Sequence, residues 1–546
     1  MDAEPETCPG AARLLVRQPG PGLAERREKV LLGQSRSLTV LLGLTFFWSV
    51  SPVWCRGVGR IPKKRYAIVV AKKTLGRPGW KEVVETLRKK HNGKIFSYEE
   101  GKLDSVQEPL KEFRPRYVCF VAPPEELERK GTVQVRGRGG RSFQLPLCGV
   151  YYREVGLLMK SLDSDPYDDA LWAVLTGATP ADALRVVEAK PLQVRRGLSH
   201  VGSGWLKWLE SGISFSETKK TQKFVKKRGK ALEEVTGPVD TTAEFVEELN
   251  SNKVDMVSTS GHATEYDWQM VFSYRSGQIV TPPRFQRLPE EARRNFERIK
   301  KEEESSPQSF KTALYAVDSL NKVYAIRTDN PKIYYSPGNC RIARVEGKEC
   351  MVLGWIHHGA FQFFGHVGLQ TRSCYAWGIA EYFLSLQGRF TFAEAVWLNQ
   401  QALWFTVSQM KDGDPRKYVC CRNQTCLPAG RSFFWETTVL YGDPAWEARV
   451  KPVVKPLYDQ RVRRRRLSRG VVELVFTVTM RRPAVPSRPA AFLLDLPGQW
   501  EVEVRKGPRN LVVTENFALI PFWKHGQRPP KPGKKYTAVV RLKPRR

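Results

Sequence analysis

The stretch KIYYSPGNC, residues 332–340, decides the expected fold of this chain. Its apolar, β-prone residues 333–335 predict a buried strand, and the Pro-Gly pair after them is expected to end it. A side chain just past a parallel strand lies at the carboxyl edge of the sheet, where α/β folds place their chemistry. Cys340 is therefore expected at such an edge, with the apolar run at residues 359–367 as the neighbouring strand.

A second stretch, KVDMVSTSGHATEYDW at residues 253–268, has the same design. A short apolar run ends in small residues, and His262 comes directly after Gly261. A catalytic cysteine needs such a partner, because a free thiol has a pKa of about 8.5 and an adjacent imidazolium favours the thiolate at neutral pH. Cys340 and His262 are therefore the candidate catalytic residues.

At these residues the sequence resembles the gingipain-type cysteine peptidases of the caspase-like clan. GHA at residues 261–263, followed by Glu265 and Trp268, is similar to the family's histidine block. GNC at residues 338–340 and GAFQFFG at residues 359–365 are similar to its cysteine block. The two blocks in this order carry the resemblance, because either one alone is a weak signal.

The resemblance covers residues 65–449 and implies an α/β fold with a caspase-like parallel sheet and helices on both faces. It implies a cysteine endopeptidase, a hydrolase, that cleaves peptide bonds with a His262–Cys340 dyad. Backbone N–H groups of Ala263 and Cys340 would stabilise the oxyanion. The expected partner is a protein or peptide substrate.

The sequence departs from the family pattern in two places. Ala263 stands where the family usually has glycine, so its Cβ narrows the approach to the oxyanion. His262 and Cys340 are 78 positions apart (340 − 262), which is longer than expected for the family. The charged segment at residues 289–306 is the expected insertion, and it would lie beside the site.

Two further residues are candidates for the substrate pocket. The acidic turn SLDSDPYDDA, residues 161–170, matches a family turn that shapes a pocket for a basic side chain, which makes Asp165 a candidate. An Asx-rich turn or a calcium-binding loop explains the same residues. His366 follows the predicted strand and is the second candidate. We predict no metal site at the histidines and no required cofactor, although the resemblance is compatible with calcium.

Alternating strands and helices from residue 66 onward predict a parallel sheet, and residues 202–230 are expected to be a polar, basic connector. Short apolar runs after residue 452 predict a small immunoglobulin-like β-sandwich. The predicted domains are a disordered N-terminus with a signal or anchor segment at 1–58, an N-terminal α/β subdomain at 59–235, a catalytic α/β subdomain at 236–452, and the β-sandwich at 453–546.

The apolar run SLTVLLGLTFFWSV at residues 37–50 follows a basic flank, which is typical of a signal peptide. A buried helix would give the same run, but its lack of a polar face favours export. We therefore expect a secreted or cell-envelope protein, with an uncleaved N-terminal anchor as a variant. Cys420, Cys421 and Cys426 favour a disulfide-bonded loop over a zinc site.

The chain carries 89 Lys and Arg against 56 Asp and Glu, a formal net charge of +33. Such a balance favours polyanionic partners, but its spread along the chain fits a general compositional bias. The basic run RVRRRR at residues 461–466 is either a solvated linker or a contact for phosphate or a membrane surface. An anionic surface is thus an open partner class, and nucleic acid is not expected. The rival functions are an inactive envelope protein and a polyanion-binding protein.

Overall fold

The computed structural model describes residues 65–544 apart from 129–130, 137–141, 148–149, 272–273, 275, 306–312, 369–375, 409–437, 497, 499 and 524–526. The predicted signal or anchor segment and the cysteine cluster at 420–426 lie outside these residues. None of the helices in the described ranges combines the length and the apolar character that crossing a bilayer requires. The described residues belong to one compact unit, and the three predicted domain boundaries stay predictions.

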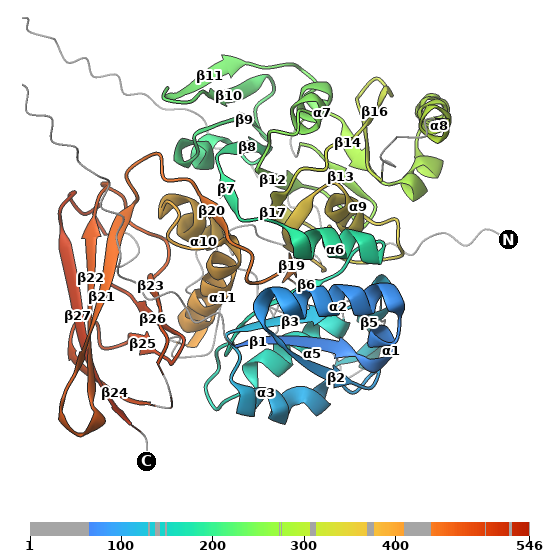
Figure 1. Cartoon of the computed structure of the whole chain (residues 1–546). Helices are drawn as coiled ribbons and strands as arrows, with labels where there is room; N and C mark the ends of the chain where they lie inside the picture. The colour runs from blue at the N-terminus through green and yellow to red at the C-terminus, as the bar shows by residue number, and fades with distance from the viewer. Residues whose placement is uncertain are drawn as a thin grey trace, which may run out of the picture. The chain divides into compact units, whose positions relative to one another are not determined.

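A twelve-stranded, mostly parallel sheet runs through the α/β part, in the order β11-β10-β9-β8-β12-β17-β18-β19-β6-β3-β1-β2 (Figure 1). The predicted α/β class is confirmed. Its strands are β1 (Tyr66–Ala71), β2 (Lys94–Tyr98), β3 (Tyr117–Val121), β6 (Leu171–Leu175), β8 (Arg196–Ser199), β9 (Ser211–Phe215), β10 (Gln222–Lys226), β11 (Leu232–Thr236), β12 (Met256–Gly261), β17 (Lys332–Asn339), β18 (Ala360–His366) and β19 (Thr438–Gly442).

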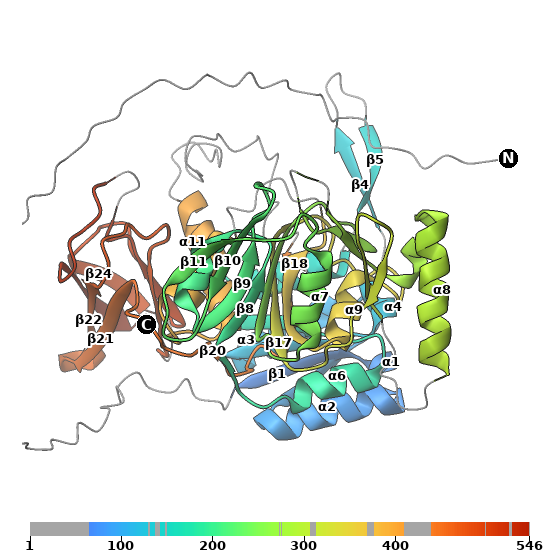
Figure 2. The ribbon, with the colours of Figure 1, turned by 90° about the horizontal axis from the view of Figure 1, so that it is seen from above.

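Helices flank this sheet, and α2 and α6 pack together along one side of it (Figure 2). The strands β1, β3 and β6 are buried at every residue, because helices leave neither face to solvent. Thr179 caps α6 through a reciprocal pair of hydrogen bonds with Asp182. The main helices are α2 (Pro78–His91), α3 (Gln107–Phe113), α5 (Val150–Lys160), α6 (Pro180–Glu188), α7 (Thr242–Asn250), α9 (Met351–His357) and α11 (Phe392–Ser408).

Strand direction reverses once in the middle of the sheet. β18 is parallel to β17 but antiparallel to β19, and β19 is parallel to β6. The carboxyl ends of β12 and β17 therefore share an edge with the amino ends of β19 and β6. The acidic turn before β6 lies at this same edge.

Two local predictions are wrong. The residues predicted as a connector form β9 and β10, which with β11 after them extend the main sheet at its edge. Backbone pairing at an edge does not require apolar side chains, so basic residues did not signal these strands.

The Pro-Gly pair does not end β17 either, because the strand continues to Asn339 through a register shift opposite Ser258 and Ser260. A bulge accommodates Pro337, which has no N–H to donate.

The segment between β12 and β17 forms a small unit with its own apolar core. A four-stranded antiparallel sheet, β13-β14-β15-β16, packs against α8 (Glu290–Glu304). The charged segment predicted as an insertion contains this helix. The strands are β13 (Asp267–Gln269), β14 (Gln278–Val280), β15 (Tyr315–Val317) and β16 (Val323–Ala325). The core residues are Val280, Phe285, Leu288, Ala292, Phe296, Ile299, Tyr315, Val317 and Val323.

After residue 457 two antiparallel sheets face each other, as the predicted β-sandwich requires. Alternate residues of β22 are buried, and Phe476 on it contacts Phe492 of the opposite sheet with ring centroids 4.9 Å apart. The sheets are β21-β22-β27-β24 and β23-β26-β25. The strands are β21 (Tyr458–Arg466), β22 (Val472–Met480), β23 (Ala490–Leu493), β24 (Trp500–Lys506), β25 (Val512–Val513), β26 (Phe517–Ile520) and β27 (Lys535–Pro544).

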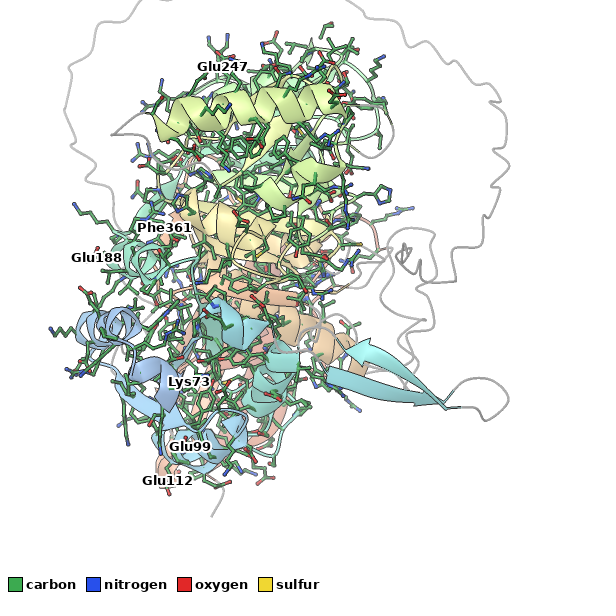
Figure 3. The ribbon with its side chains drawn as sticks, turned by 90° about the vertical axis from the view of Figure 1, so that its right-hand side faces the viewer. Lys73, Glu99, Glu112, Glu188, Glu247 and Phe361 are labelled. Carbon is green, nitrogen blue, oxygen red and sulfur yellow. The ribbon has the colours of Figure 1, made fainter. Side chains whose placement is uncertain are left out.

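Two smaller strand pairs complete the described structure. β4 (Gly131–Arg136) and β5 (Ser142–Leu147) form an antiparallel arm that projects from the body (Figures 2 and 3). β7 (Leu192–Val194) pairs in parallel with β20 (Ala448–Val450), which joins two segments far apart in the sequence.

Candidate active site

The two predicted catalytic residues follow neighbouring strands. β12 and β17 are parallel and adjacent, and their register pairs Gly261 with Asn339. His262 and Cys340 are the next residues, so both leave the sheet at one edge, from strands about 4.8 Å apart. His262 is exposed, Cys340 is half-buried, and Cys340 is not in a disulfide. The edge therefore brings a thiol and an imidazole into one neighbourhood that solvent reaches.

The backbone before His262 has a conformation that favours glycine. Gly261 has a φ of 117°, and a Cβ there would come within 2.7 Å of the Gln269 carbonyl oxygen. The Gln269 N–H donates to the His262 carbonyl at 2.8 Å, so β13 holds this turn closely. The hairpin that presents the histidine thus requires a glycine directly before it.

Ala263 forms an isolated antiparallel bridge with Trp268. The flanking hydrogen bonds run from Thr264 N–H to the Asp267 carbonyl and from Gln269 N–H to the His262 carbonyl. In such a pair the bridged residues themselves do not exchange hydrogen bonds. The Ala263 N–H therefore points away from β13, as the predicted oxyanion donor would need.

Asn339 ties the two strand ends together. Its buried side-chain oxygen accepts hydrogen bonds from the Thr259 hydroxyl at 2.8 Å and the Ser336 hydroxyl at 2.6 Å. Its amide nitrogen donates to the Gly261 carbonyl at 3.1 Å. Sequence reasoning missed this role, although a polar residue in an otherwise apolar strand, directly before Cys340, was a usable signal.

A second histidine, His200, lies in the interior behind this sheet edge and supports it only by packing. His200 is fully buried among the rings of Phe215, Phe245 and Trp268. Burial lowers its pKa to about 3, so the ring stays neutral at ordinary pH. Trp268 also donates to the Ser260 carbonyl at 2.7 Å, which fixes the strand just before His262. The cluster supports the histidine turn by packing.

Charged residues line the same edge. Arg341, directly after Cys340, has a φ of 53°, and its Nε lies 3.6 Å from a carboxylate oxygen of Glu265. This ion pair joins the loop after β17 to the loop after β12. Burial raises the pKa of Glu217, in the loop after β9, and a hydrogen bond with Ser260 offsets part of this rise. Sequence reasoning missed Glu217, because one glutamate in a basic segment gives no signal.

The structure places His366 in the interior and not on a surface that a ligand could contact. It is buried at the end of β18, and a ring nitrogen lies 3.4 Å from the Pro337 carbonyl oxygen. Burial lowers its pKa to about 4. In the predicted substrate pocket, His366 would not contact the substrate but would support the pocket wall from behind β17. His357, which pairs with Asp182 at 2.8 Å, and the buried His358 lie at the opposite end of β18.

Asp165 lies at the shared edge but not beside the dyad. The sheet order puts β6 three strands from β17, about 14 Å at ordinary spacing. Its carboxylate accepts the Tyr167 N–H at 2.8 Å, which shapes the turn. Carboxylate oxygens of Asp163, Asp165 and Asp169 all lie within 4.8 Å of one another. Carboxylates in this density suit a calcium ion, the ligand that the resemblance allows.

These carboxyl groups raise one another's pKa. Burial, with repulsion from neighbouring carboxylates, raises the pKa of Asp169 to about 10 and that of Asp165 to about 7. Glu515, from the β-sandwich, belongs to the same acidic group. Bound protons or a bound cation would relieve the repulsion.

Replacing Asp169 by asparagine is expected to flatten the pH dependence of thermal stability between about pH 5 and pH 8. Raised pKa values mean that the folded state keeps protons that the unfolded state has released, so stability falls as pH rises through this window. Calcium added at the higher pH should raise the Tm of the wild type more than that of the variant.

The matched control is Asp104→Asn, at an exposed aspartate outside the acidic turn. Scanning calorimetry of the three proteins, with and without calcium, measures both effects. An unchanged pH slope in Asp169→Asn would show that Asp169 does not titrate as its surroundings require.

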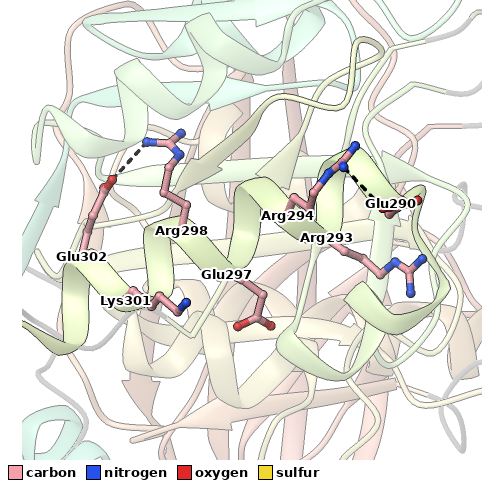
Figure 4. A pocket seen from close by; sticks show the side chains of 7 residues that line it. All are labelled: Glu290, Arg293, Arg294, Glu297, Arg298, Lys301 and Glu302. Carbon is pink, nitrogen blue, oxygen red and sulfur yellow. Dashed lines mark hydrogen bonds and ion pairs between the residues drawn. The ribbon is translucent and has the colours of Figure 1, made fainter.

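Two hollows lie in the unit between β12 and β17. One is a cavity of about 320 Å³ beside the histidine turn. Its lining includes Gln269 and the polar side chains of Tyr274, Gln278 and Asp318. The second hollow lies along α8, and all its lining side chains come from that one helix (Figure 4). Pairs such as Arg298 and Glu302 satisfy its charges, so it is a solvated helix face. The first cavity is the better place for a substrate side chain.

No protein-family model, curated protein or solved structure matches this chain. Function is therefore inferred from the chemistry of the sheet edge and from the sequence resemblance. That edge holds a thiol, an imidazole, a suitably directed backbone N–H and a half-buried carboxyl group. This set of groups can carry out acyl transfer.

Proposed function

We propose that the chain is a cysteine endopeptidase of the gingipain type, with a caspase-like sheet and an immunoglobulin-like β-sandwich after it. The observation that carries the proposal is the register of β12 and β17, which end side by side at Gly261 and Asn339. A nucleophile and a base that follow rigid, hydrogen-bonded strand ends lose little entropy in reaching a reactive arrangement.

The proposed reaction begins when His262 takes the proton of the Cys340 thiol. The thiolate attacks the scissile carbonyl carbon, and the carbonyl π electrons move to oxygen, where N–H groups of Ala263 and Cys340 stabilise the negative charge. The C–N bond then breaks, and His262 gives its proton to the leaving amine. Water, deprotonated by His262, hydrolyses the thioester and regenerates the thiol.

The acidic surroundings favour substrates with a basic side chain. Glu217 is better placed than Asp165 to attract it, because Glu217 interacts with Ser260, two residues before His262. The polar cavity that begins at Gln269 offers a second position for a substrate side chain. Secretion or cell-envelope attachment, and calcium at the acidic turn, belong to the same proposal and derive from the sequence.

Alkylation with iodoacetamide tests the dyad without knowledge of the substrate. At neutral pH Cys340 is expected to react up to about 30-fold faster in the wild type than in His262→Ala, because in the proposed dyad His262 takes the proton of the thiol as the sulfur attacks. Peptide mapping by mass spectrometry assigns the modified cysteine. Cys119 and Cys350 are buried and should stay unmodified in the folded protein.

His357→Ala is the matched control, since His357 lies at the opposite end of β18. Its Cys340 should react at the wild-type rate. Equal alkylation rates in the wild type and His262→Ala would contradict the dyad and favour an inactive binding protein.

A further inference from the structure

β21 is an edge strand covered with arginine. It is the outermost strand of its sheet and pairs only with β22. Five of its side chains are exposed guanidinium groups: Arg461, Arg463, Arg464, Arg465 and Arg466. The basic run that the sequence left open as a linker or a phosphate contact is therefore an ordered strand.

Register divides these arginines into two rows. Arg461, Arg463 and Arg465 lie opposite Thr477, Val475 and Glu473 of β22. Those three β22 residues are half-buried, whereas the residues between them are buried in the sandwich, so this row lies on the solvent face. Successive arginines of the row are about 6.7 Å apart along the strand. A straight line of evenly spaced cations results.

Among the residues that the structure describes, no carboxylate neutralises this row. Within the described residues, none of the five arginines forms an ion pair, and Glu473, opposite Arg465, is bound to Arg541 at 3.2 Å. Uncompensated like charges repel one another and cost stability. The arrangement is explained if an external polyanion supplies the missing charge.

A simpler explanation of the arginines is that they protect the sheet edge from pairing with another chain. The charges on two other edge strands argue against this explanation. Charged side chains at an edge prevent pairing with another chain, and either sign serves. β11, one of the two edge strands of the main sheet, carries Glu233 and Glu234, and β24 mixes Glu503 with Arg505. Only β21 among these edges concentrates one sign and one residue type.

The neighbouring side chains narrow the class of polyanion. Guanidinium groups bind sulfate and phosphate groups through paired hydrogen bonds. Sequence-tolerant binding of single-stranded nucleic acid needs aromatic side chains for base stacking, and the solvent face of β21 and β22 has none. Binding within a membrane interface needs exposed apolar anchors, whereas Val475 on this face and Val462 on the other face of β21 are only half-buried aliphatic side chains.

We propose that the solvent face of β21 binds an anionic polysaccharide that carries sulfate or phosphate groups. The polymer lies along the strand, and Arg461, Arg463 and Arg465 each contact one anionic group. This site is independent of the proposed peptidase activity, because it stands on a separate sheet and uses none of the edge residues around Cys340.

Heparin, a sulfated polysaccharide, is the probe for the test. Replacing Arg461, Arg463 and Arg465 together by glutamine in the full chain should weaken heparin binding at least about tenfold near 0.1 M salt. The slope of log affinity against log salt should fall by about 2 to 3, one for each lost contact. Titration calorimetry over several salt concentrations measures both, and the Tm of the variant reports its folding.

The matched control removes the same charge from α8, by replacing Arg293, Arg294 and Lys301 with glutamine (Figure 4). It should bind heparin within about threefold of the wild type, because three of many dispersed charges matter little. Equal losses in the two variants would show that net charge alone drives binding, and would overturn the proposal. Tighter binding of duplex DNA or phosphatidylserine vesicles than of heparin, with the same dependence on β21, would overturn the polysaccharide assignment.

Discussion

Replacing Cys340 by alanine is expected to abolish peptide-bond cleavage, with a loss of about 10⁴-fold or more in kcat/KM. The variant has no nucleophile, and the remaining groups can only polarise a carbonyl that nothing attacks. The thermal stability should change little, since Cys340 is half-buried at a strand end and is not in a disulfide. Cleavage profiles of a peptide library, collected for both proteins, measure the effect.

Cys350→Ala is the matched control for this experiment. Cys350 is buried at the start of α9, ten positions after Cys340 (350 − 340), so its replacement should lower the Tm and leave the cleavage profile intact. Undiminished cleavage by Cys340→Ala would remove Cys340 as the nucleophile. A wild type that cleaves no peptide, yet alkylates slowly at Cys340, would favour the inactive alternative.

Replacing Gly261 by alanine is expected to lower the free energy of unfolding by about 1–3 kcal/mol and kcat/KM by about 10²-fold. The new Cβ would lie 2.7 Å from the Gln269 carbonyl oxygen, at a φ of 117° that alanine rarely adopts. Relief of this contact would shift the hairpin that presents His262, and a displacement of about 1 Å is enough to slow the reaction.

Gly101→Ala separates the two causes. Gly101 also has a positive φ, of 80°, but a Cβ there meets no atom within 4 Å. This control should lose stability and keep full activity. Chemical denaturation and steady-state kinetics distinguish the variants. Wild-type activity in Gly261→Ala would show that the exact position of the histidine turn does not matter for the reaction.

Local patterns predicted the regular core well. The continuous apolar runs of β1, β3 and β6 are the mark of strands covered on both faces, and the structure buries them completely. The cap of α6 is equally local, because Thr179 and Asp182 stand at the spacing that a capping pair needs. Such features depend on neighbours within a few residues, which the sequence displays directly.

Local patterns failed where an edge or a bulge decided the outcome. The basic segment that contains β9 and β10 resembles a connector, yet β9 pairs with β8 and β10 pairs with β9, which makes both of them strands. Pro337 resembles the end of a strand, yet a bulge lets β17 continue to Asn339. Each case depends on a partner strand far away in the sequence.

The sequence by itself indicated that a histidine and a cysteine each follow a strand, since Gly261-His262 and Asn339-Cys340 each come a few small or turn-forming residues after an apolar run. Only the tertiary structure decided that these strands are neighbours in register, and that Asn339 and Glu217 meet the same edge. It also decided that the acidic turn lies three strands away and that Arg461, Arg463 and Arg465 form one row on the solvent face of an edge strand. The physical reason is that strand order and register are set by contacts between distant segments, whose free energy no local pattern contains.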